Sequence, residues 1–275
     1  MSKVLSTLND QPIVFYGKVI DQDGNPISDV TVNANVAISK QWMEKTYKSY
    51  TTNSDSNGLF QFEGLRGMAL LIGLQKEGYQ YSSTDNGYNY SAVYTEKERH
   101  HPDANAPVIF KMWKLQGPQQ LVTIGANAYL PCNGSSSSFD LLTHRKVSDG
   151  GDITVSITRN PQNIQGVHQF DWKAVVQVTN GGLVARNDQY PNEAPVDGYQ
   201  SQIVIDMPKD AKPWFDDYRH TYYLKIRGGQ YGRVSLEIYA AFEQPNVPFN
   251  FSGYVNPTGS RNLELAAPLG KGQQP

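Results

Sequence analysis

The sequence has one cysteine, few charged residues and no long apolar run, and each of these scarcities excludes a class of protein. A single cysteine, Cys132, rules out an intrachain disulfide framework. No stretch approaches the ~18 consecutive apolar residues of a membrane-spanning helix, so we expect no transmembrane segment in this chain. Charged residues make up 18% of the chain, the formal net charge is −2, and no Lys/Arg cluster stands out. We therefore expect no nucleic-acid partner.

The residues that are abundant indicate a turn-rich β protein. The chain has 275 residues, of which 39% are hydrophobic, with 24 glycines and 16 prolines. This composition favours folded hydrophobic cores joined by many turns over a disordered or helical chain. The length suits two domains or one large all-β domain. Tyrosine is frequent, at 17 residues, which is typical of strands that keep their hydroxyl groups in contact with water.

The first hundred residues carry a continuous strand-and-turn pattern. Apolar and polar residues alternate from Val14 to Ile20, as in a half-buried strand. Asp23–Pro26 forms a turn signal, because glycine tolerates positive φ and proline presets φ for the returning chain. Asn57-Gly58 is a strong hairpin signal, and Phe60 and Phe62 then share one face of the next strand. The pattern predicts a small antiparallel β-sandwich.

This segment resembles the carboxypeptidase regulatory-like domain, a transthyretin-like β-sandwich related to the CnaB and starch-binding-like folds. The matching elements are Gly17-x-Val19 with Asp23-Gly24-x-Pro26, then Asp55-x-x-Gly58-x-Phe60, then Lys76-x-Gly78-Tyr79. The resemblance implies the fold and an accessory or adhesive module. It implies no activity, because such modules occur in many contexts.

The rest of the chain repeats the β style without repeating the sequence. Gly117-Pro118 marks the boundary, so we expect a polar lead at 1–12, the first sandwich at 13–117, a second antiparallel β domain at 118–267 and a disordered tail at 268–275. The predicted strands of the second domain are Leu121–Ile124, Ile153–Thr158, Trp172–Val178, Gln202–Asp206, Thr221–Ile226 and Tyr231–Ala240. Asn133-Gly134 and the four serines after it are interpreted as a turn cluster.

The second half also resembles one group of uncharacterised bacterial proteins of planctomycete and verrucomicrobial type. The recurring motifs are Asp171-Trp172, Gly181-Gly182-Leu183, Glu193-Ala194-Pro195-x-x-Gly198-Tyr199 and Asn256-Pro257-x-Gly259-Ser260-Arg261-Asn262-Leu263-Glu264. This resemblance implies a secreted or envelope-anchored protein and brings no known activity. We therefore expect an extracytoplasmic protein whose export segment lies outside this sequence, with a cytoplasmic protein as the alternative.

Two short motifs carry metal-ligand residue types, and both have a simpler interpretation. Asn53-x-Asp55-x-Asn57-Gly58 matches the first half of an EF-hand loop, but the twelfth position, where a glutamate is needed, is Gly64. Its asparagine–glycine pair makes a hairpin unaided. His100 and His101 are adjacent, and neighbouring side chains on an extended chain point in opposite directions. We predict neither a metal site nor a cofactor.

No coherent catalytic motif is present. The chain has no Gly-x-Ser-x-Gly elbow and no Ser-x-x-Lys pair. Cys132 lies near His144 in sequence, but a buried structural cysteine is the favoured interpretation. Asp216-Asp217 and the acids at 149–152 are residue types that glycoside hydrolysis uses, although acids in turns are mostly caps. The favoured function is non-catalytic, and the alternative is a glycan-processing hydrolase or its accessory subunit.

Aromatic residues are the one remaining candidate for a binding site. The proposed platform consists of Trp42, Tyr79, Tyr81, Tyr88, Tyr90 and Tyr94. Aromatic rings stack on sugar faces and anchor protein interfaces, and the alternative is that these rings cover one face of the sandwich. The sequence thus predicts an extracytoplasmic binding or assembly protein whose partner is a protein, a surface glycan or further copies of itself.

Overall fold

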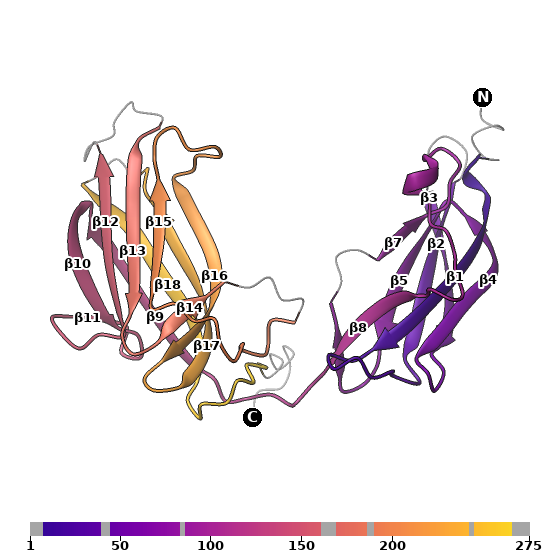
Figure 1. Cartoon of the computed structure of the whole chain (residues 1–275), viewed down its shortest axis with the longest axis horizontal. Coiled ribbons are helices and arrows are strands. Elements are labelled where there is room, and N and C mark those ends of the chain that lie inside the picture. The colour runs from indigo at the N-terminus through magenta and orange to yellow at the C-terminus, as the bar shows by residue number, and fades with distance from the viewer. Residues whose placement is uncertain are drawn as a thin grey trace, which may run out of the picture. The chain divides into compact units, whose positions relative to one another are not determined.

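The computed structural model describes residues 8–39, 45–82, 86–160, 169–185, 190–241 and 245–265, and their regular secondary structure is almost entirely β-strand (Figure 1). The predicted all-β fold is confirmed. The chain divides into two compact units, Met1–Gln116 and Gly117–Pro275. No helix in the described ranges is long and apolar enough to cross a membrane. Trp42 and the predicted tail at 268–275 lie outside the described residues.

The first unit is a sandwich of two four-stranded sheets. Its strands are β1 (Gln11–Ile20), β2 (Thr31–Ser39), β3 (Lys45–Asn53), β4 (Leu59–Gly67), β5 (Ala69–Gln75), β6 (Tyr79–Tyr81), β7 (Gly87–Asn89) and β8 (Val108–Lys114), with a 3-10 turn η2 (Glu96–Glu98). The sheet orders are β4-β1-β8-β6 and β3-β2-β5-β7. All pairs are antiparallel except β1 with β8, which is parallel.

The core of the first unit follows directly from the alternation in its strands. Ile13, Phe15 and Val19 of β1 are completely buried, whereas Val14, Tyr16 and Lys18 alternate with them and face outward. Gly17 stands in the same inward row, where a Cβ atom would lie 2.2 Å from the ring of Phe60. The glycine of the Gly-x-Val motif is therefore required by the packing of one aromatic ring across the sheet.

The second unit is a sandwich of two five-stranded sheets. Its strands are β9 (Val122–Pro131), β10 (Asn133–Asp140), β11 (Arg145–Val147), β12 (Ile153–Asn160), β13 (Asp171–Val178), β14 (Gly182–Val184), β15 (Gln202–Met207), β16 (Asp217–Ile226), β17 (Gln230–Tyr239) and β18 (Asn246–Asn256). The sheet orders are β11-β10-β12-β13-β15 and β14-β16-β17-β18-β9. Their inward faces form one core that includes Trp172, Phe249 and Phe251.

One interpretation of the sequence was wrong. The serine run after Asn133 is strand β10 and not a turn cluster. The strand forms because Ser137 and Phe139 point into the core while Ser136 and Ser138 face out, next to Ser156 and Thr154 of β12. Tertiary pairing thus overrides the weak intrinsic preference of serine for strands.

The C-terminal motif of the second unit forms a network of hydrogen bonds around Glu264. The buried Glu264 carboxylate accepts hydrogen bonds from the Tyr190 hydroxyl and the Gly117 backbone, each at 2.7 Å. Arg261 binds Glu193 at 2.8 Å and also donates to the Ala194 carbonyl. These contacts fasten the first and last segments of the unit to each other, so this part of the motif has a structural role.

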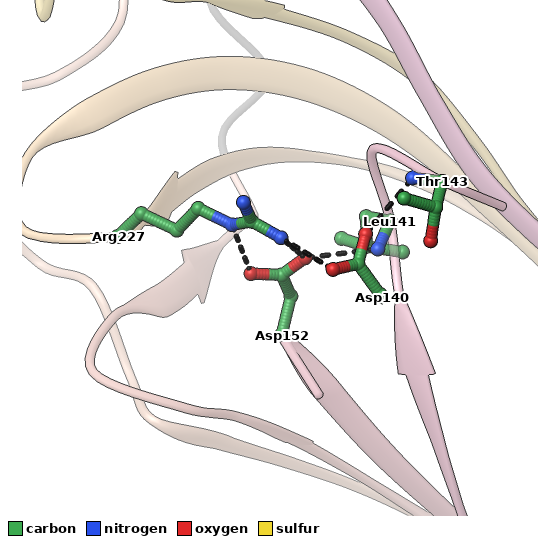
Figure 2. A network of polar contacts seen from close by, with 5 residues as sticks. All are labelled: Asp140, Leu141, Thr143, Asp152 and Arg227. Carbon is green, nitrogen blue, oxygen red and sulfur yellow. Dashed lines mark hydrogen bonds and ion pairs between the residues drawn. The ribbon is translucent and has the colours of Figure 1, made fainter. Parts of the chain in front are cut away.

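An arginine joins the two sheets of the second unit at one end (Figure 2). Arg227 lies in the β16–β17 turn, and its guanidinium binds the Asp152 carboxylate through Nε at 2.6 Å and Nη2 at 2.9 Å. The same Nη2 reaches Asp140 at the end of β10, also at 2.9 Å. Hydrogen bonding to Asp152 raises the pKa of Arg227, so the guanidinium stays charged.

We predict that Arg227→Ala destabilises the protein by about 2 kcal/mol. Removing a partner from a fully buried pair costs ~3–5 kcal/mol, and Arg227 is partly exposed while Asp152 is buried. Urea unfolding measures the change. Arg219→Ala is the matched control, since Arg219 and Asp217 form an exposed pair that contributes under ~1 kcal/mol. Equal losses from the two variants would contradict a joining role for Arg227.

Candidate functional site

The tyrosines that sequence reasoning selected lie mostly against the core of the first unit. Tyr90 is buried, and its hydroxyl donates a 2.6 Å hydrogen bond to the Val14 carbonyl. Tyr79, Tyr81 and Tyr88 are partly buried and pack on the same core. These contacts are the ones expected if the rings cover the sandwich, and a recognition role for the segment stays a prediction. Tyr94 is 40% exposed.

The two candidate metal motifs serve local structure. One Asp55 carboxylate oxygen accepts hydrogen bonds from the backbone of Asn57 and Leu59, both at 2.8 Å, which closes the hairpin turn. The His100 ring packs on Phe15 at a centroid distance of 5.0 Å and also contacts Tyr88 and Tyr90. Within the described part of the chain, no group of three or more His, Cys, Asp or Glu side chains is placed to hold a metal ion.

The residues considered for catalysis also have structural partners. Cys132 is buried, and burial raises the pKa of its thiol, which disfavours the reactive thiolate. Asp152 belongs to the Arg227 contact, and Asp217 binds Arg219.

The burial of His100 makes the stability of the first unit depend on pH. Burial in an apolar setting lowers the pKa of His100 below its ordinary value of 6.5, and the neighbouring His101 adds to the effect. The unfolded chain therefore binds more protons than the folded chain as pH falls below about 6.5. The stabilisation is complete above that pH and is lost as the pH falls toward the folded pKa.

We predict that His100→Phe reduces the fall in melting temperature between pH 7.5 and pH 5.5. Phenylalanine keeps the ring contacts and removes the protonation. Scanning calorimetry at the two pH values measures the difference. His101→Phe at the exposed neighbour is the comparison, and it should give a smaller reduction because it removes only the lesser cause of the lowered pKa. An unchanged pH dependence in His100→Phe, or an equal reduction in His101→Phe, would contradict the assignment.

A cleft opens on the second unit where the edges of its two sheets face each other. The cavity holds about 320 Å³. Its lining comes from β14 and the residue after it, from the segment before β15, from β15 and from β16: Leu183, Val184, Ala185, Gly198, Gln200, Ile203, Val204 and Tyr222. None of these side chains is charged. Tyr222 is buried, its hydroxyl group contacts that of Tyr218, and burial raises the pKa of Tyr222.

Two glycines just before the cleft-lining residue Leu183 allow the chain to approach its neighbours closely. A Cβ atom on Gly181 would lie 1.8 Å from the Lys225 carbonyl oxygen, and one on Gly182 would lie 2.7 Å from that of Gln200. The Leu183 and Gln200 backbones exchange two hydrogen bonds of 2.9 Å, which link β14 to the segment before β15. The Gly181-Gly182-Leu183 motif is therefore explained by close backbone approach at this point.

The two strands along the cleft, β15 and β16, each have an edge, or part of one, that is not hydrogen-bonded to another strand among the described residues. In its sheet, β15 is an end strand and pairs only with β13. β16 pairs with β17 over its full length, but β14 covers only Tyr223–Lys225 on its other side. Over the described ranges, two strand segments therefore offer backbone N–H and C=O groups to a further strand: Asp217–Tyr222 of β16 and Gln202–Met207 of β15.

Sequence reasoning predicted both strands as Gln202–Asp206 and Thr221–Ile226 but did not find the cleft. The alternation in each strand indicates which side chains are buried, and it carries no information on which strands are end strands. That property depends on the order of strands in the two sheets, which are built from segments far apart in the chain. The Gly181-Gly182 pair was the only local signal of a close approach.

Comparisons with known proteins do not assign a family. No protein-family model matches the chain, and no curated protein matches it. Among solved structures, it is similar at 16% identity and a TM-score of 0.27 to 3-chlorocatechol 1,2-dioxygenase from Rhodococcus opacus 1CP, covering 38% of this chain and 60% of that one. It is similar at 12% identity to a streptococcal ancillary pilin, with a TM-score of 0.23 and coverages of 88% and 58%. The shaft pilin spaA of Lactobacillus rhamnosus GG is 12% identical, with a TM-score of 0.25 and coverages of 95% and 99%.

Proposed function

We propose that this chain is a non-catalytic assembly protein that accepts an extended segment of a partner protein as an added strand at the cleft. The observation that carries the proposal is the pair of strand edges that no described strand covers, on β15 and β16, on either side of an uncharged cavity. A second copy of the chain is one partner of the required kind.

Strand addition fits the physical character of this cleft. A β-strand places backbone donors and acceptors along its edge, and an incoming strand forms hydrogen bonds with them whatever its sequence. Alternate side chains of that strand then fill the space beside Leu183, Ile203 and Tyr222. Burial of apolar area in such a site stabilises the complex by roughly 25 cal/mol per Å². The partner segment is therefore extended, with apolar residues at every second position.

The proposal also covers the domain type of the first unit and the location of the protein in the cell. The motifs from Gly17 to Tyr79 support a carboxypeptidase regulatory-like module in the first unit, and the motifs of the second half support display outside the cytoplasm. An assembly role in the cell envelope suits both. Fractionation of cells that express the native gene tests the location, and recovery in the cytosol alone would contradict it.

We predict that a photo-crosslinking residue at Val204 captures a discrete partner. Val204 lies on β15 beside the cleft and is 46% exposed. Val122 is the matched control, because it is a 40% exposed valine on β9, the end strand farthest from β14 in the other sheet. Irradiation in envelope extracts, and with the purified chain alone, gives crosslinks that mass spectrometry maps to a partner segment.

The expected result is a crosslink at Val204 to an extended segment of one protein and none at Val122. Val204→Lys provides the second test, since a charge at a sheet edge opposes strand addition and an exposed substitution changes folding by under ~0.5 kcal/mol. Loss of assembly with normal folding supports the proposal. Equal crosslinking at both positions, or assembly unaffected by Val204→Lys, would contradict it.

A further inference from the structure

A row of two exposed tyrosines and one partly buried proline crosses part of the outer face of the sheet β14-β16-β17-β18-β9. Tyr129 of β9 is 64% exposed and Tyr239 of β17 is 44% exposed. Pro248 of β18 lies between them, opposite Tyr129 in the strand register. The next residues, Leu130 and Ile238, are buried in the core, so the row belongs to the outer face. We name Tyr129, Pro248 and Tyr239 the ring row.

The strand register sets the spacing of the ring row. Ile238 pairs with Phe249, which places Tyr239 beside Pro248 one step farther along the two strands. Neighbouring strands lie about 4.8 Å apart, so the two tyrosines are on the order of 10 Å apart with proline between them. This is a nearly continuous apolar strip, one ring wide, across three strands. A strip of this shape matches an extended chain of flat rings.

Hydrogen-bonding side chains form a second row beside the rings. Asn127, Asn250, Glu237 and Arg219 occupy consecutive strands at the next outward position, because Asn127 pairs with Asn250, Asn250 with Glu237 and Glu237 with Arg219. Arg219 Nε lies 3.1 and 3.2 Å from the two carboxylate oxygens of Asp217, which pairs with Tyr239 at the end of the ring row. The row therefore offers both donors and acceptors next to the apolar strip.

The charge on this face favours a neutral ligand. Within the two rows, Asp217 and Arg219 neutralise each other and Glu237 leaves a single negative charge. Arg233 and Lys225 lie farther along the same face, so charges of both signs are mixed there and no patch of one sign attracts a polyanion or an anionic membrane. Stacked sugar rings present apolar C–H faces to aromatic side chains, and their hydroxyl groups, which both donate and accept, suit amides and paired charges. The outer face carries both features side by side.

We propose that the ring row and the row beside it form a binding site for an extended, neutral polysaccharide. The sugar rings stack on Tyr129, Pro248 and Tyr239, and their hydroxyl groups bind Asn127, Asn250 and the Asp217–Arg219 pair. The ring row lies on the outer face of its sheet, and none of its three residues lines the cleft. Asp217 and Arg219 belong to the β16 edge of the assembly proposal, so the two sites are separated by the variants at Tyr129, Tyr239 and Val204.

Affinity electrophoresis in native gels tests the site. The intact chain is run with and without soluble hydroxyethylcellulose, xyloglucan or glucomannan, and with amylopectin as a neutral polymer that is coiled rather than extended. We expect retardation by at least one of the three extended polymers. Tyr129→Ala and Tyr239→Ala each weaken binding about fivefold or more, since loss of an anchoring aromatic costs over ~1 kcal/mol.

Three control variants make the result specific. Tyr129→Phe keeps the ring and retains binding. Tyr47→Ala removes an equally exposed tyrosine, 57% exposed, from the first unit and leaves binding unchanged. Val204→Lys alters the cleft and leaves binding unchanged, which separates this site from the proposed assembly function. Circular dichroism confirms that each variant is folded.

Several outcomes would overturn the proposal. An intact chain that migrates identically with and without all three extended polymers has no such site. Retardation that survives both tyrosine-to-alanine changes places the sugar site elsewhere. Retardation by amylopectin alone contradicts the match to an extended chain.

Discussion

The architecture of the second unit depends on how its two sheets are held together at their margins. At one end, Arg227 reaches from the β16–β17 turn to Asp152 and Asp140 of the opposite sheet, where removal of the arginine would leave a buried carboxylate without its cation. Along the side formed by β15 and β16, sheet-to-sheet contact gives way to the uncharged cleft. The Arg227 contacts hold the two sheets together at one end of the sandwich, next to the side where β15 and β16 border the cleft.

Much of the fold was predictable because side-chain alternation is a local property. The pattern from Val14 to Ile20 became β1, with Phe15 and Val19 buried and Lys18 facing out. Asn57-Gly58 became the turn before β4, with Gly58 at φ 74° and the Asp55 side chain capping the turn. Gly58 is needed for its backbone conformation and Gly17 for close packing. Glycines required for such local reasons can be recognised in a single sequence.

The sites were less predictable because they depend on sheet order and solvent exposure. The local sequence would place Tyr88, between Gly87 and Asn89, on the surface and Tyr129, between Ala128 and Leu130, in the core. The structure shows the reverse: Tyr88 packs on Phe15 at 4.6 Å, and Tyr129 is 64% exposed. β18, which carries Pro248, was not predicted as a strand at all, since Asn246–Asn256 mixes proline, asparagine and glycine with its aromatic residues. Without β18 and its register, Tyr129 and Tyr239 cannot be placed in one row. The knowledge that β15 is an end strand likewise requires the sheet order.

The central claim is that the edges of β15 and β16 accept a strand. Amide hydrogen exchange tests it most directly, comparing the purified chain with the same chain in its native assembly. The account predicts that protection rises in Gln202–Met207 and Asp217–Tyr222, while β12, already paired on both sides, changes little. Assembly that leaves exchange in both edges unchanged, or that protects other segments alone, would contradict the account.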